Sequence, residues 1–531
     1  MTISTKYIVN KYIAFCNKNN IQVQTHQIYG ALWCFRKENE DNEDTQRGDK
    51  QRGGILADDM GMGKTIQMIA TIFLNFRKKT LILLPPILIQ QWYSEIFKIL
   101  GHSASVYYKQ NRHSIDLYNS HTMVVITSYD TFLRSPELLE INWDRTICDE
   151  AHRLRNPKTK LYKQIGQLQT DILWCITGTP IHNKIKDVMS LFALYGVGVG
   201  AGGKVEKIEE DVYKTMILRR TKSTTNLLLP KKTETQEMIS WSNPEEWKLA
   251  KDVHMSMMGT RQEKEDSFWN TKQINDLVTM IRAKQLCILP KLLEKTIQRL
   301  ELDEPDDLFP TDFKNTTQQH TSCKLKAIIR HILARANNGR GKIIFCHFQL
   351  EMTKIAELLR EAIPNIPNND VWIGNWKEYL LDKTTDKHKQ NPNKILIMQI
   401  RSGCEGLNLQ KDFSEIYFVS PNWNPTLEEQ AIARCHRIGQ QKEVSVFRFY
   451  MDNLLSESEI LEETQSKQDI MTYGWIINKI PDDITRYIHE FLVNDVYMPK
   501  NIVYSIDMYT LFKQNEKRKN ISDFLNTITI R

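Results

Sequence analysis

Three separated segments of the sequence carry residue types that suit the chemistry of a nucleotide. Residues 59–65 place two glycines before a lysine and a threonine, and residues 149–152 begin with two adjacent carboxylates. Residues 430–440 hold two arginines that are three positions apart. Together they predict a phosphate cradle, a site for a metal ion and a water molecule, and cations that meet phosphate charge.

The first segment follows a short apolar run and predicts a loop that leads into a helix. Gly61 and Gly63 let the backbone pass close to phosphate oxygens, and the N–H groups at the helix start point toward that anion. Lys64 is placed to reach the β- and γ-phosphates, and the hydroxyl of Thr65 is placed to bind Mg²⁺. Asp58 replaces the first glycine of the common G-x-x-x-x-G-K-T pattern, so that generic pattern is matched only in part.

The other two segments supply carboxylates and cations. Asp149 and Glu150 follow an apolar run, which places Asp149 to hold the metal ion and Glu150 to orient or deprotonate the attacking water. The spacing of Arg434 and Arg437 predicts one face of a helix, and an arginine that meets γ-phosphate charge typically raises the rate by about 10³–10⁵. A surface acidic pair and a solvated basic helix are the alternative interpretations. The co-occurrence with Lys64 favours the nucleotide site.

Short apolar runs alternate with helical patterns and predict two α/β lobes. The runs are 55–57, 80–84, 123–126, 146–148 and 172–176, then 342–346, 395–398, 416–419 and 444–447. Such bounded runs are typical of buried parallel strands, and open α/β sheets bind ligands at the carboxyl ends of these strands. The predicted domains are a first lobe at 1–195, a helical insert and linker at 196–320, a second lobe at 321–455 and a helical tail at 456–531.

The composition limits the kind of protein. The 531 residues, 41% hydrophobic and 25% charged, predict about three or four folded units. A net charge of +7 permits a polyanionic partner without requiring one. Nine cysteines without a C-x-x-C pair or Cys/His cluster argue against zinc and a disulfide framework. No apolar run approaches the roughly 20 residues of a membrane span and residues 1–6 lack a signal-peptide pattern, so we expect a soluble, intracellular protein.

Over roughly residues 22–455 the sequence resembles the Swi/Snf ATPase family of the superfamily-two helicases. In that family's form of motif I, Asp58 is the usual residue, so the departure from the generic loop supports the resemblance. The similar blocks, in order, are a glutamine motif with His26 and Gln27, motif I at 53–67, Ia at 84–92, Ib at 127–129, II at 149–156, III at 177–183, a basic interlobe stretch at 218–232, IV at 342–348, V at 402–409, Trp423-Asn424-Pro425, and VI at 430–440. The sequence departs from the family pattern at Cys404 and Glu405 and around 374–377.

The resemblance implies two RecA-like lobes, ATP and Mg²⁺ as cofactors, and DNA-dependent ATP hydrolysis. The nucleotide contacts that it implies are Gln27, Asp59, Gly61, Met62, Gly63, Lys64, Thr65, Asp149, Gly406, Arg434 and Arg437, with Thr65 and Asp149 on the metal. The DNA contacts that it implies are Pro86, Gln91, Trp92, Thr127, Ser128, Tyr129, His347, Ser402, Asn408 and Trp423. The residues implied to couple hydrolysis to lobe movement are Thr177, Gly178, Thr179 and Gln430.

We therefore predict an ATP-dependent translocase on double-stranded DNA, acting in chromatin remodelling, transcription or repair. The alternatives are an RNA or single-strand helicase and a non-hydrolysing DNA-binding scaffold. The predicted location is the nucleus or a viral replication site, with packaging in a virion as a further alternative, because the many Ile, Lys and Asn residues are typical of an A+T-rich genome such as that of a large DNA virus. Residues 480–492 faintly resemble the first helix of an F-box, so the tail is either a protein-binding segment or an amphipathic helix that caps the second lobe.

Overall fold

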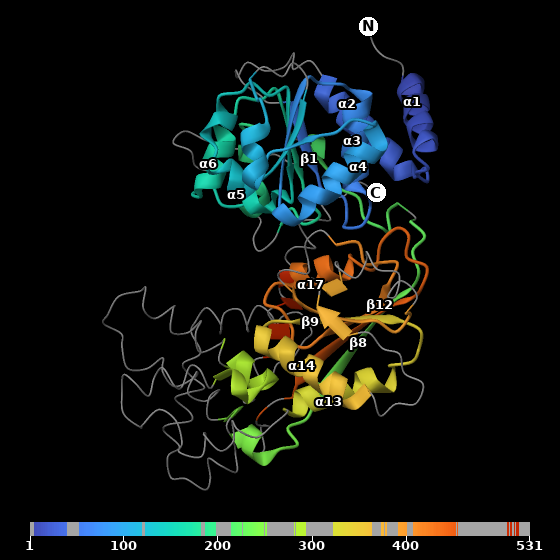
Figure 1. Cartoon of the computed structure of the whole chain (residues 1–531), viewed down its shortest axis with the longest axis vertical. Helices are drawn as coiled ribbons and strands as arrows, with labels where there is room; N and C mark the ends of the chain where they lie inside the picture. Colours follow the sequence, from blue (N-terminus) through green and yellow to red (C-terminus); the bar gives the residue numbers. More distant parts are fainter. Residues whose placement is uncertain are drawn as a thin grey trace, which may run out of the picture.

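Two α/β lobes lie one above the other along the long axis of the molecule (Figure 1). The computed structural model describes residues 5–39, 52–118, 123–181, 186–197, 214–225, 227–248, 250–251, 281, 283–293, 322–363, 373–375, 378–379, 391–400, 407–452 and 454, and, in the tail, 507–508, 510–511, 514–515 and 517–519. Each lobe is built on its own parallel sheet, so the prediction of two RecA-like lobes is confirmed.

The sheet of the first lobe has the strand order β3-β4-β2-β5-β6-β1-β7, and all neighbours are parallel. Its strands are β1 (Arg52–Leu56), β2 (Lys79–Leu84), β3 (Ser105–Val106), β4 (Met123–Ser128), β5 (Arg145–Asp149), β6 (Ile172–Ile176) and β7 (Ile217–Leu218). Because β5, β6 and β1 are neighbours, the loops that follow them meet at one edge of the sheet.

Helices cover both faces of this sheet, as parallel strands require. The helical segments are α1 (Thr5–Lys18), α2 (Thr25–Asn39), α3 (Lys64–Leu74), η1 (Pro86–Leu88), α4 (Ile89–Leu100), η2 (Lys109–Ser114), α5 (Tyr129–Phe132), η3 (Pro136–Leu139), η4 (Ala151–Leu154), α6 (Lys160–Gly166) and α7 (Lys186–Ala193). Successive strand residues point to opposite faces. Ile55 thus belongs to the core under α5–α7, whereas Leu56 belongs to the core under α1–α4.

The second lobe repeats this plan with the strand order β10-β11-β9-β12-β13-β8, again all parallel. Its elements are β8 (Lys232–Ile239), η5 (Pro290–Leu293), α13 (Cys323–Ala334), β9 (Gly341–Cys346), α14 (Gln349–Ala362), β10 (Ile373–Asn375), β11 (Ile395–Gln399), β12 (Phe413–Phe418), α17 (Pro425–Ile432) and β13 (Val444–Met451). Ile344 packs in the core beneath α13 and α14, and Ile343 packs in the core beneath α17.

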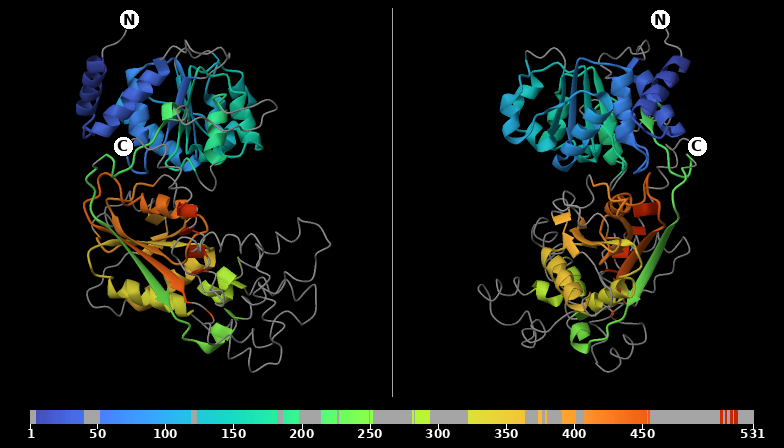
Figure 2. Two further views of the ribbon diagram at one scale, coloured as in Figure 1. Left: turned by 180° about the vertical axis from the view of Figure 1, so that it is seen from behind. Right: turned by 45° about the vertical axis from the view of Figure 1, so that its right-hand side comes forward.

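The segment between the lobes contributes a strand to each sheet. β7 pairs with β1 in the first lobe and β8 pairs with β13 in the second. Within the predicted helical insert and linker at 196–320, residues 217–218 and 232–239 therefore form strands rather than helices. Figure 2 shows this green segment running from one lobe to the other along the outside of the molecule.

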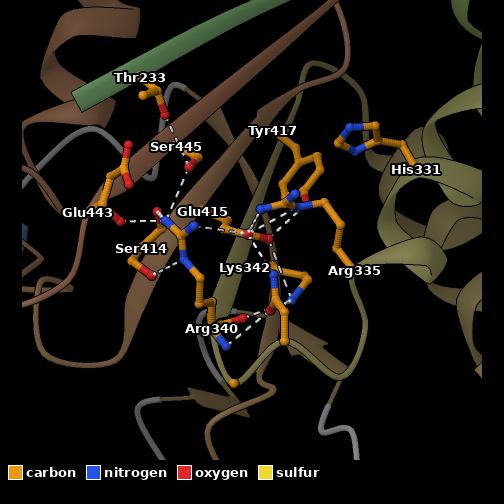
Figure 3. A network of polar contacts seen from close by, with 12 residues as sticks. Thr233, His331, Arg335, Arg340, Lys342, Ser414, Glu415, Tyr417, Glu443 and Ser445 are labelled. Carbon is orange, nitrogen blue, oxygen red and sulfur yellow. Dashed lines mark hydrogen bonds and ion pairs between the residues drawn. The ribbon is translucent and has the colours of Figure 1, made fainter. Parts of the chain in front are cut away.

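Each lobe buries a carboxylate near the amino ends of its strands, away from the edge where the motif residues lie. In the first lobe it is Glu38, which pairs with Arg145. In the second lobe it is Glu415 on β12, which receives hydrogen bonds from Arg335 and from the hydroxyl of Tyr417 (Figure 3). Lys342 Nζ lies 3.5 Å from the same carboxylate. Burial raises the pKa of Glu415, but the hydrogen bond from Arg335 and the charge of Lys342 outweigh burial, and the pKa lies below its usual range.

The described tail residues pack against the second lobe beside α17. Gln514 Nε2 donates to Glu428 Oε1 at 2.7 Å, and Lys517 Nζ donates to the carbonyl of Trp423 at 3.0 Å. Asp507 forms a buried ion pair with Lys324. Residues 480–492, for which an F-box-like helix was one prediction, lie outside the described residues, as do Ser402 and Gly406.

None of the described helices combines the length and the apolar character of a bilayer-spanning segment. Within the described part of the chain, no three His, Cys, Asp or Glu side chains gather as a metal-binding group would.

Candidate functional site

The loop between β1 and α3 has a conformation that favours glycine at two positions. Gly61 and Gly63 have positive φ angles of 85° and 80°. A Cβ atom on Gly63 would lie 2.3 Å from Nε2 of Gln27, and one on Gly61 would lie 2.7 Å from Cβ of Arg437. α3 begins at Lys64 without a side-chain cap, so its first backbone N–H groups remain available to an anion.

The predicted glutamine motif supports this loop from beneath. Gln27 Nε2 donates to the carbonyl oxygen of Met62 at 3.1 Å, and His26 Nε2 lies 3.0 Å from the same oxygen. All three side chains are buried. The hydrogen bond between Gln27 and Met62 therefore stabilises the conformation of the loop, and contact of either residue with the nucleotide stays a prediction.

Lys64 projects into the space between the loop and the carboxylates. Its ammonium donates to the backbone carbonyls of Asp58 at 2.8 Å and Asp59 at 3.2 Å. Burial lowers the pKa of Lys64, while the negative charges of Glu150 and Asp149 favour its protonated form. The site therefore holds one ammonium against several carboxylates.

Asp149 is the last residue of β5, and hydrogen bonds fix its carboxylate. Oδ2 accepts the indole N–H of Trp92 at 2.7 Å, and Oδ1 accepts the backbone N–H of Glu150 at 2.9 Å. The hydroxyl of Tyr129 donates to the Asp149 carbonyl at 2.7 Å. Burial and the charge of Glu150 raise the pKa of Asp149.

Glu150 stands in the left-handed region, with φ at 51°, which turns its side chain out of the strand direction. Its Oε2 lies 3.2 Å from Nδ1 of His152, and its Oε1 lies 3.8 Å from Nη2 of Arg434 across the lobe boundary. Burial raises the pKa of Glu150, but His152, Arg434 and Lys64 together outweigh burial and lower it. Glu150 is therefore ionised at neutral pH.

The arginines reach the site from the second lobe, but not from a helix face. α17 ends at Ile432, and Arg434 and Arg437 lie in the turns that follow. The prediction of one helical face is thus wrong, because the chain turns directly after Ala433. Arg437 nevertheless donates to Oδ1 of Asn408. Burial and the charge of Arg434 lower the pKa of Arg437 to about 10, so it remains a cation.

These groups line one cavity of about 100 Å³ between the lobes. From the first lobe come Lys64, Thr65, Asp149 and Glu150, and from the second come Arg434 and Arg437. The volume suits phosphate groups rather than a whole nucleotide. A hydroxyl and a carboxylate beside a phosphate-binding loop are ligands that Mg²⁺ prefers, so the residues fit a magnesium-bound phosphate.

The residues predicted to couple the lobes also meet. Gln430 Nε2 lies 3.5 Å from the hydroxyl of Thr179, and Thr177 Oγ1 accepts the backbone N–H of Thr179 at 3.1 Å. Gly178 lies against the loop, since a Cβ atom there would be 2.5 Å from Met60 Cγ. The turn after β6 therefore touches both the phosphate loop and the second lobe.

The linker holds the acidic start of the loop. Asp58 is fully buried, and its two oxygens accept Nε of Arg220 at 2.9 Å and Nη2 at 2.5 Å. Arg220 Nη2 also donates to Oε1 of Gln67 on α3 at 3.0 Å. This fork gives Asp58 a structural reason to stand where other phosphate loops have glycine.

Asp59 was predicted to contact the nucleotide, but its carboxylate faces the linker. Oδ1 lies 3.1 Å from Nη2 of Arg219, and Oδ2 accepts the backbone N–H of Lys222 at 3.3 Å. The Lys222 ammonium in turn donates to the carbonyl of His436, beside the arginines, at 2.7 Å. The Asp59 carboxylate thus contacts the linker, and contact of Asp59 with the nucleotide stays a prediction.

Four residues predicted to contact DNA from the first lobe have inward-facing side chains. Trp92, Thr127, Ser128 and Tyr129 are at most 1% exposed. Besides the contacts of Trp92 and Tyr129 with Asp149, Thr127 Oγ1 donates to the carbonyl of Tyr107, and Ser128 accepts the N–H that begins α5. Packing and internal hydrogen bonds occupy these four side chains in this structure, and their contact with DNA stays a prediction.

The other predicted DNA contacts are more open. Pro86 and Gln91 in the first lobe and His347 and Trp423 in the second are half-buried, and Asn408 is exposed. Gln91 lines the cavity described above. DNA contact by all five residues stays a prediction.

Sequence reasoning missed Glu95 on α4, which also lines the cavity. The signal that could have found it is its position: it lies one helical turn beyond Gln91 and therefore on the same face. The sequence shows Arg219 and Arg220 only as part of a basic stretch, and the fold pairs them with Asp59 and Asp58 at the start of the loop.

A family model, the SNF2-related domain, matches residues 26–201. The chain is 26% identical over 488 residues to the "Probable global transactivator" of Orgyia pseudotsugata multicapsid polyhedrosis virus, covering 86% of this chain and 91% of the viral protein. It is 27% identical over 494 residues to "Chromodomain-helicase-DNA-binding protein 8" of Danio rerio, covering 85% of this chain and 19% of that protein.

"DNA repair and recombination protein RAD54B" of Gallus gallus is 25% identical over 87% of this chain and 55% of its own length. The chain therefore spans most of the viral relative but only part of the two animal relatives. Among solved structures, the "Sulfolobus solfataricus SWI2/SNF2 ATPase core in complex with dsDNA" is 23% identical, covering 91% of this chain and 97% of that one with a TM-score of 0.35.

Proposed function

Because the chain belongs to the Swi/Snf family of helicase-like ATPases, we propose that it moves along double-stranded DNA by hydrolysing ATP between its two lobes. The observation that carries the proposal is the single cavity lined from both sides. Lys64 and Glu150 face it from the first lobe, and Arg434 and Arg437 face it from the second. A site divided in this way is complete only when the lobes approach each other.

Each residue has a chemical task in this proposal. The N–H groups at the start of α3 and the Lys64 ammonium hold the phosphates. Thr65 and Asp149 would hold Mg²⁺, which would neutralise phosphate charge when bound. Ionised Glu150 accepts a hydrogen bond from the attacking water and takes up its proton. Arg434 and Arg437 meet the charge that develops on the γ-phosphate.

Movement along DNA would follow from lobe closure. The contact of Gln430 with Thr179 connects the arginine side to the turn beside the phosphate loop. When closure changes that contact, the DNA-facing surfaces of the lobes shift relative to each other. We expect contacts with phosphates rather than bases, so binding should be independent of sequence and should weaken with salt.

The proposal extends to where the protein works. Its relatives include a viral protein described as a probable global transactivator, a protein named as a chromodomain-helicase-DNA-binding protein and one named for DNA repair and recombination. We infer that the chain acts on DNA in the nucleus or at a viral replication site. Imaging of the tagged protein beside a DNA stain tests this, and exclusion from all DNA-containing compartments would contradict it.

The experiment that tests the function is steady-state ATP hydrolysis without nucleic acid and with duplex DNA, single-stranded DNA or RNA. We expect the strongest stimulation by duplex DNA. Lys64→Ala should abolish it, and Glu150→Gln should lower kcat by about 10²–10⁴. The control is Lys326→Ala, which changes an exposed lysine on α13 and should leave activity unchanged.

A triplex-displacement assay then measures movement directly. Displacement that requires ATP and is lost in Glu150→Gln supports the translocase. Preferred stimulation by RNA or single strands would instead identify a helicase. Absence of hydrolysis with every nucleic acid would identify a scaffold.

A further inference from the structure

Two polar side chains of helix α4, Gln91 and Glu95, face the cavity. The resemblance assigned Gln91 and Trp92 of this helix to DNA, yet Gln91 and Glu95 line the cavity together with Arg437. Trp92 lies on the neighbouring side of the helix and is fully buried. The side of α4 that carries these residues therefore points toward the phosphate site rather than toward an outer surface.

Trp92 restrains the carboxylate that is proposed to hold the metal. Its indole nitrogen can only donate, and at 2.7 Å from Oδ2 of Asp149 it makes a charge-assisted hydrogen bond. Oδ1 is held by the backbone N–H of Glu150. With one donor on each oxygen, the plane of the carboxylate is fixed, and each oxygen keeps further lone-pair capacity for the metal or its water.

A second observation on the same helix also points to the cavity. Glu95 Oε1 accepts a hydrogen bond from Gln91 at 3.1 Å, whereas Oε2 is buried and has no hydrogen-bond partner among the described residues. A buried carboxylate oxygen without a partner is costly unless a ligand or its water completes it. Burial raises the pKa of Glu95, and the Gln91 hydrogen bond and the charge of Arg437 act in the opposite direction.

We propose that α4 is part of the nucleotide site and that Trp92 is a positioning residue for the metal-binding carboxylate of Asp149. This inference rests on the proposed function, because it presupposes that Asp149 binds Mg²⁺ with the nucleotide. Outer hydrogen bonds that orient a metal-binding side chain are typically worth about 10–100-fold in metal affinity. Loss of the indole N–H should weaken Mg²⁺ binding by that factor and leave DNA binding unchanged.

Trp174 offers a matched control. Like Trp92, it is fully buried in the core under α1–α4 and donates its indole N–H to a carboxylate, Glu38 Oε1, at 2.8 Å. Glu38 is not among the residues that line the cavity. Replacing either tryptophan by phenylalanine removes the same ring atoms and the same kind of hydrogen bond. Only Trp92→Phe should affect Mg²⁺.

The experiment measures binding of a fluorescent ATP analogue to the full chain while Mg²⁺ is titrated, and binding of labelled duplex DNA without nucleotide. For Trp92→Phe we expect the half-saturating Mg²⁺ concentration to rise about 10–100-fold. Nucleotide binding in EDTA and DNA affinity should match those of Trp174→Phe. If Trp92→Phe does not fold, 3-benzothienylalanine at position 92 keeps the bicyclic shape and replaces N–H by sulfur.

Three results would overturn parts of this reasoning separately. An equal Mg²⁺ dependence in Trp92→Phe and Trp174→Phe refutes the positioning role and leaves only packing. Weaker DNA binding with normal Mg²⁺ dependence returns Trp92 to the DNA surface. Wild-type protein that binds no nucleotide at all refutes the proposed function, and the inference with it.

Discussion

The buried ion pair between Glu38 and Arg145 should be essential to the stability of the first lobe. Neither side chain is exposed, and Nε and Nη2 of Arg145 donate to the two oxygens of Glu38 at 2.7 and 2.5 Å. Asn75 and Trp174 add hydrogen bonds at 2.6 and 2.8 Å. The carboxylate thereby connects the end of α2 to the end of α3, to the start of β5 and to the middle of β6.

Glu38→Gln keeps the size of the side chain but leaves the Arg145 charge buried without a counter-ion. Breaking a buried pair in this way costs about 3–5 kcal/mol. In a lobe of about 200 residues, 1 kcal/mol shifts the melting temperature by about 2–4 °C. We therefore expect a decrease of roughly 6–20 °C in the transition of the first lobe, measured by calorimetry of the full chain.

Glu357→Gln is the control, because Glu357 is half exposed and pairs with Lys354 on the surface of α14 at 3.4 Å. It should cost at most about 0.5 kcal/mol. The double change Glu38→Met with Arg145→Met should recover much of the lost stability, because it removes the unpaired charge. A melting temperature of Glu38→Gln within about 2 °C of wild type would refute the reasoning.

Three further predictions follow from other contacts. Arg220→Met leaves Asp58 buried and unpaired, so it should destabilise the first lobe by about 3–5 kcal/mol and weaken nucleotide binding; unchanged values of both in calorimetry and titration would contradict this. Gln430→Ala removes a contact worth about 0.5–1.5 kcal/mol, so it should lower DNA-stimulated kcat and triplex displacement by up to roughly tenfold without changing nucleotide affinity. Because its ion pairs keep the pKa of Glu415 low, that carboxylate stabilises the protein at neutral pH, and this stabilisation is lost as the pH falls through the folded-state pKa. Glu415→Gln should therefore flatten the acid side of a plot of melting temperature against pH, and an unchanged slope would show that Glu415 does not carry this dependence.

The sequence predicted the central strands well because they are buried on both faces. Residues 172–176 and 342–346, for example, read as unbroken apolar runs, and the structure forms strands there. The sequence analysis did not predict β8, because this strand is not buried on both faces. It lies at the edge of the second sheet, and most of Lys232–Ile239 is polar and exposed. An exposed edge strand carries no apolar run, so the hydrophobic pattern cannot identify it.

The candidate site was predictable to the extent that its residues are contiguous in the sequence. The spacing of Gly61, Gly63 and Lys64 is enough to predict the phosphate loop. The Asn424-Pro425 pair likewise predicts the start of α17, where Asn424 Oδ1 caps the helix. Side-chain direction was not predictable. The sequence around Trp92 does not show whether its side chain faces DNA or Asp149, and only the packing of α4 on the sheet determines this.

The linker contacts both halves of the cavity: the phosphate loop of the first lobe and the arginine turn of the second. Arg220 holds Asp58 at the start of the phosphate loop, and two residues later Lys222 holds the carbonyl of His436, next to Arg437. His436 Nε2 also lies 2.9 Å from the carbonyl of Pro230, farther along the same linker. Because this short segment contacts both sides, the arginine turn cannot move relative to the phosphate loop without breaking or reshaping these contacts. Any movement of the lobes would therefore change the linker contacts that hold the phosphate loop.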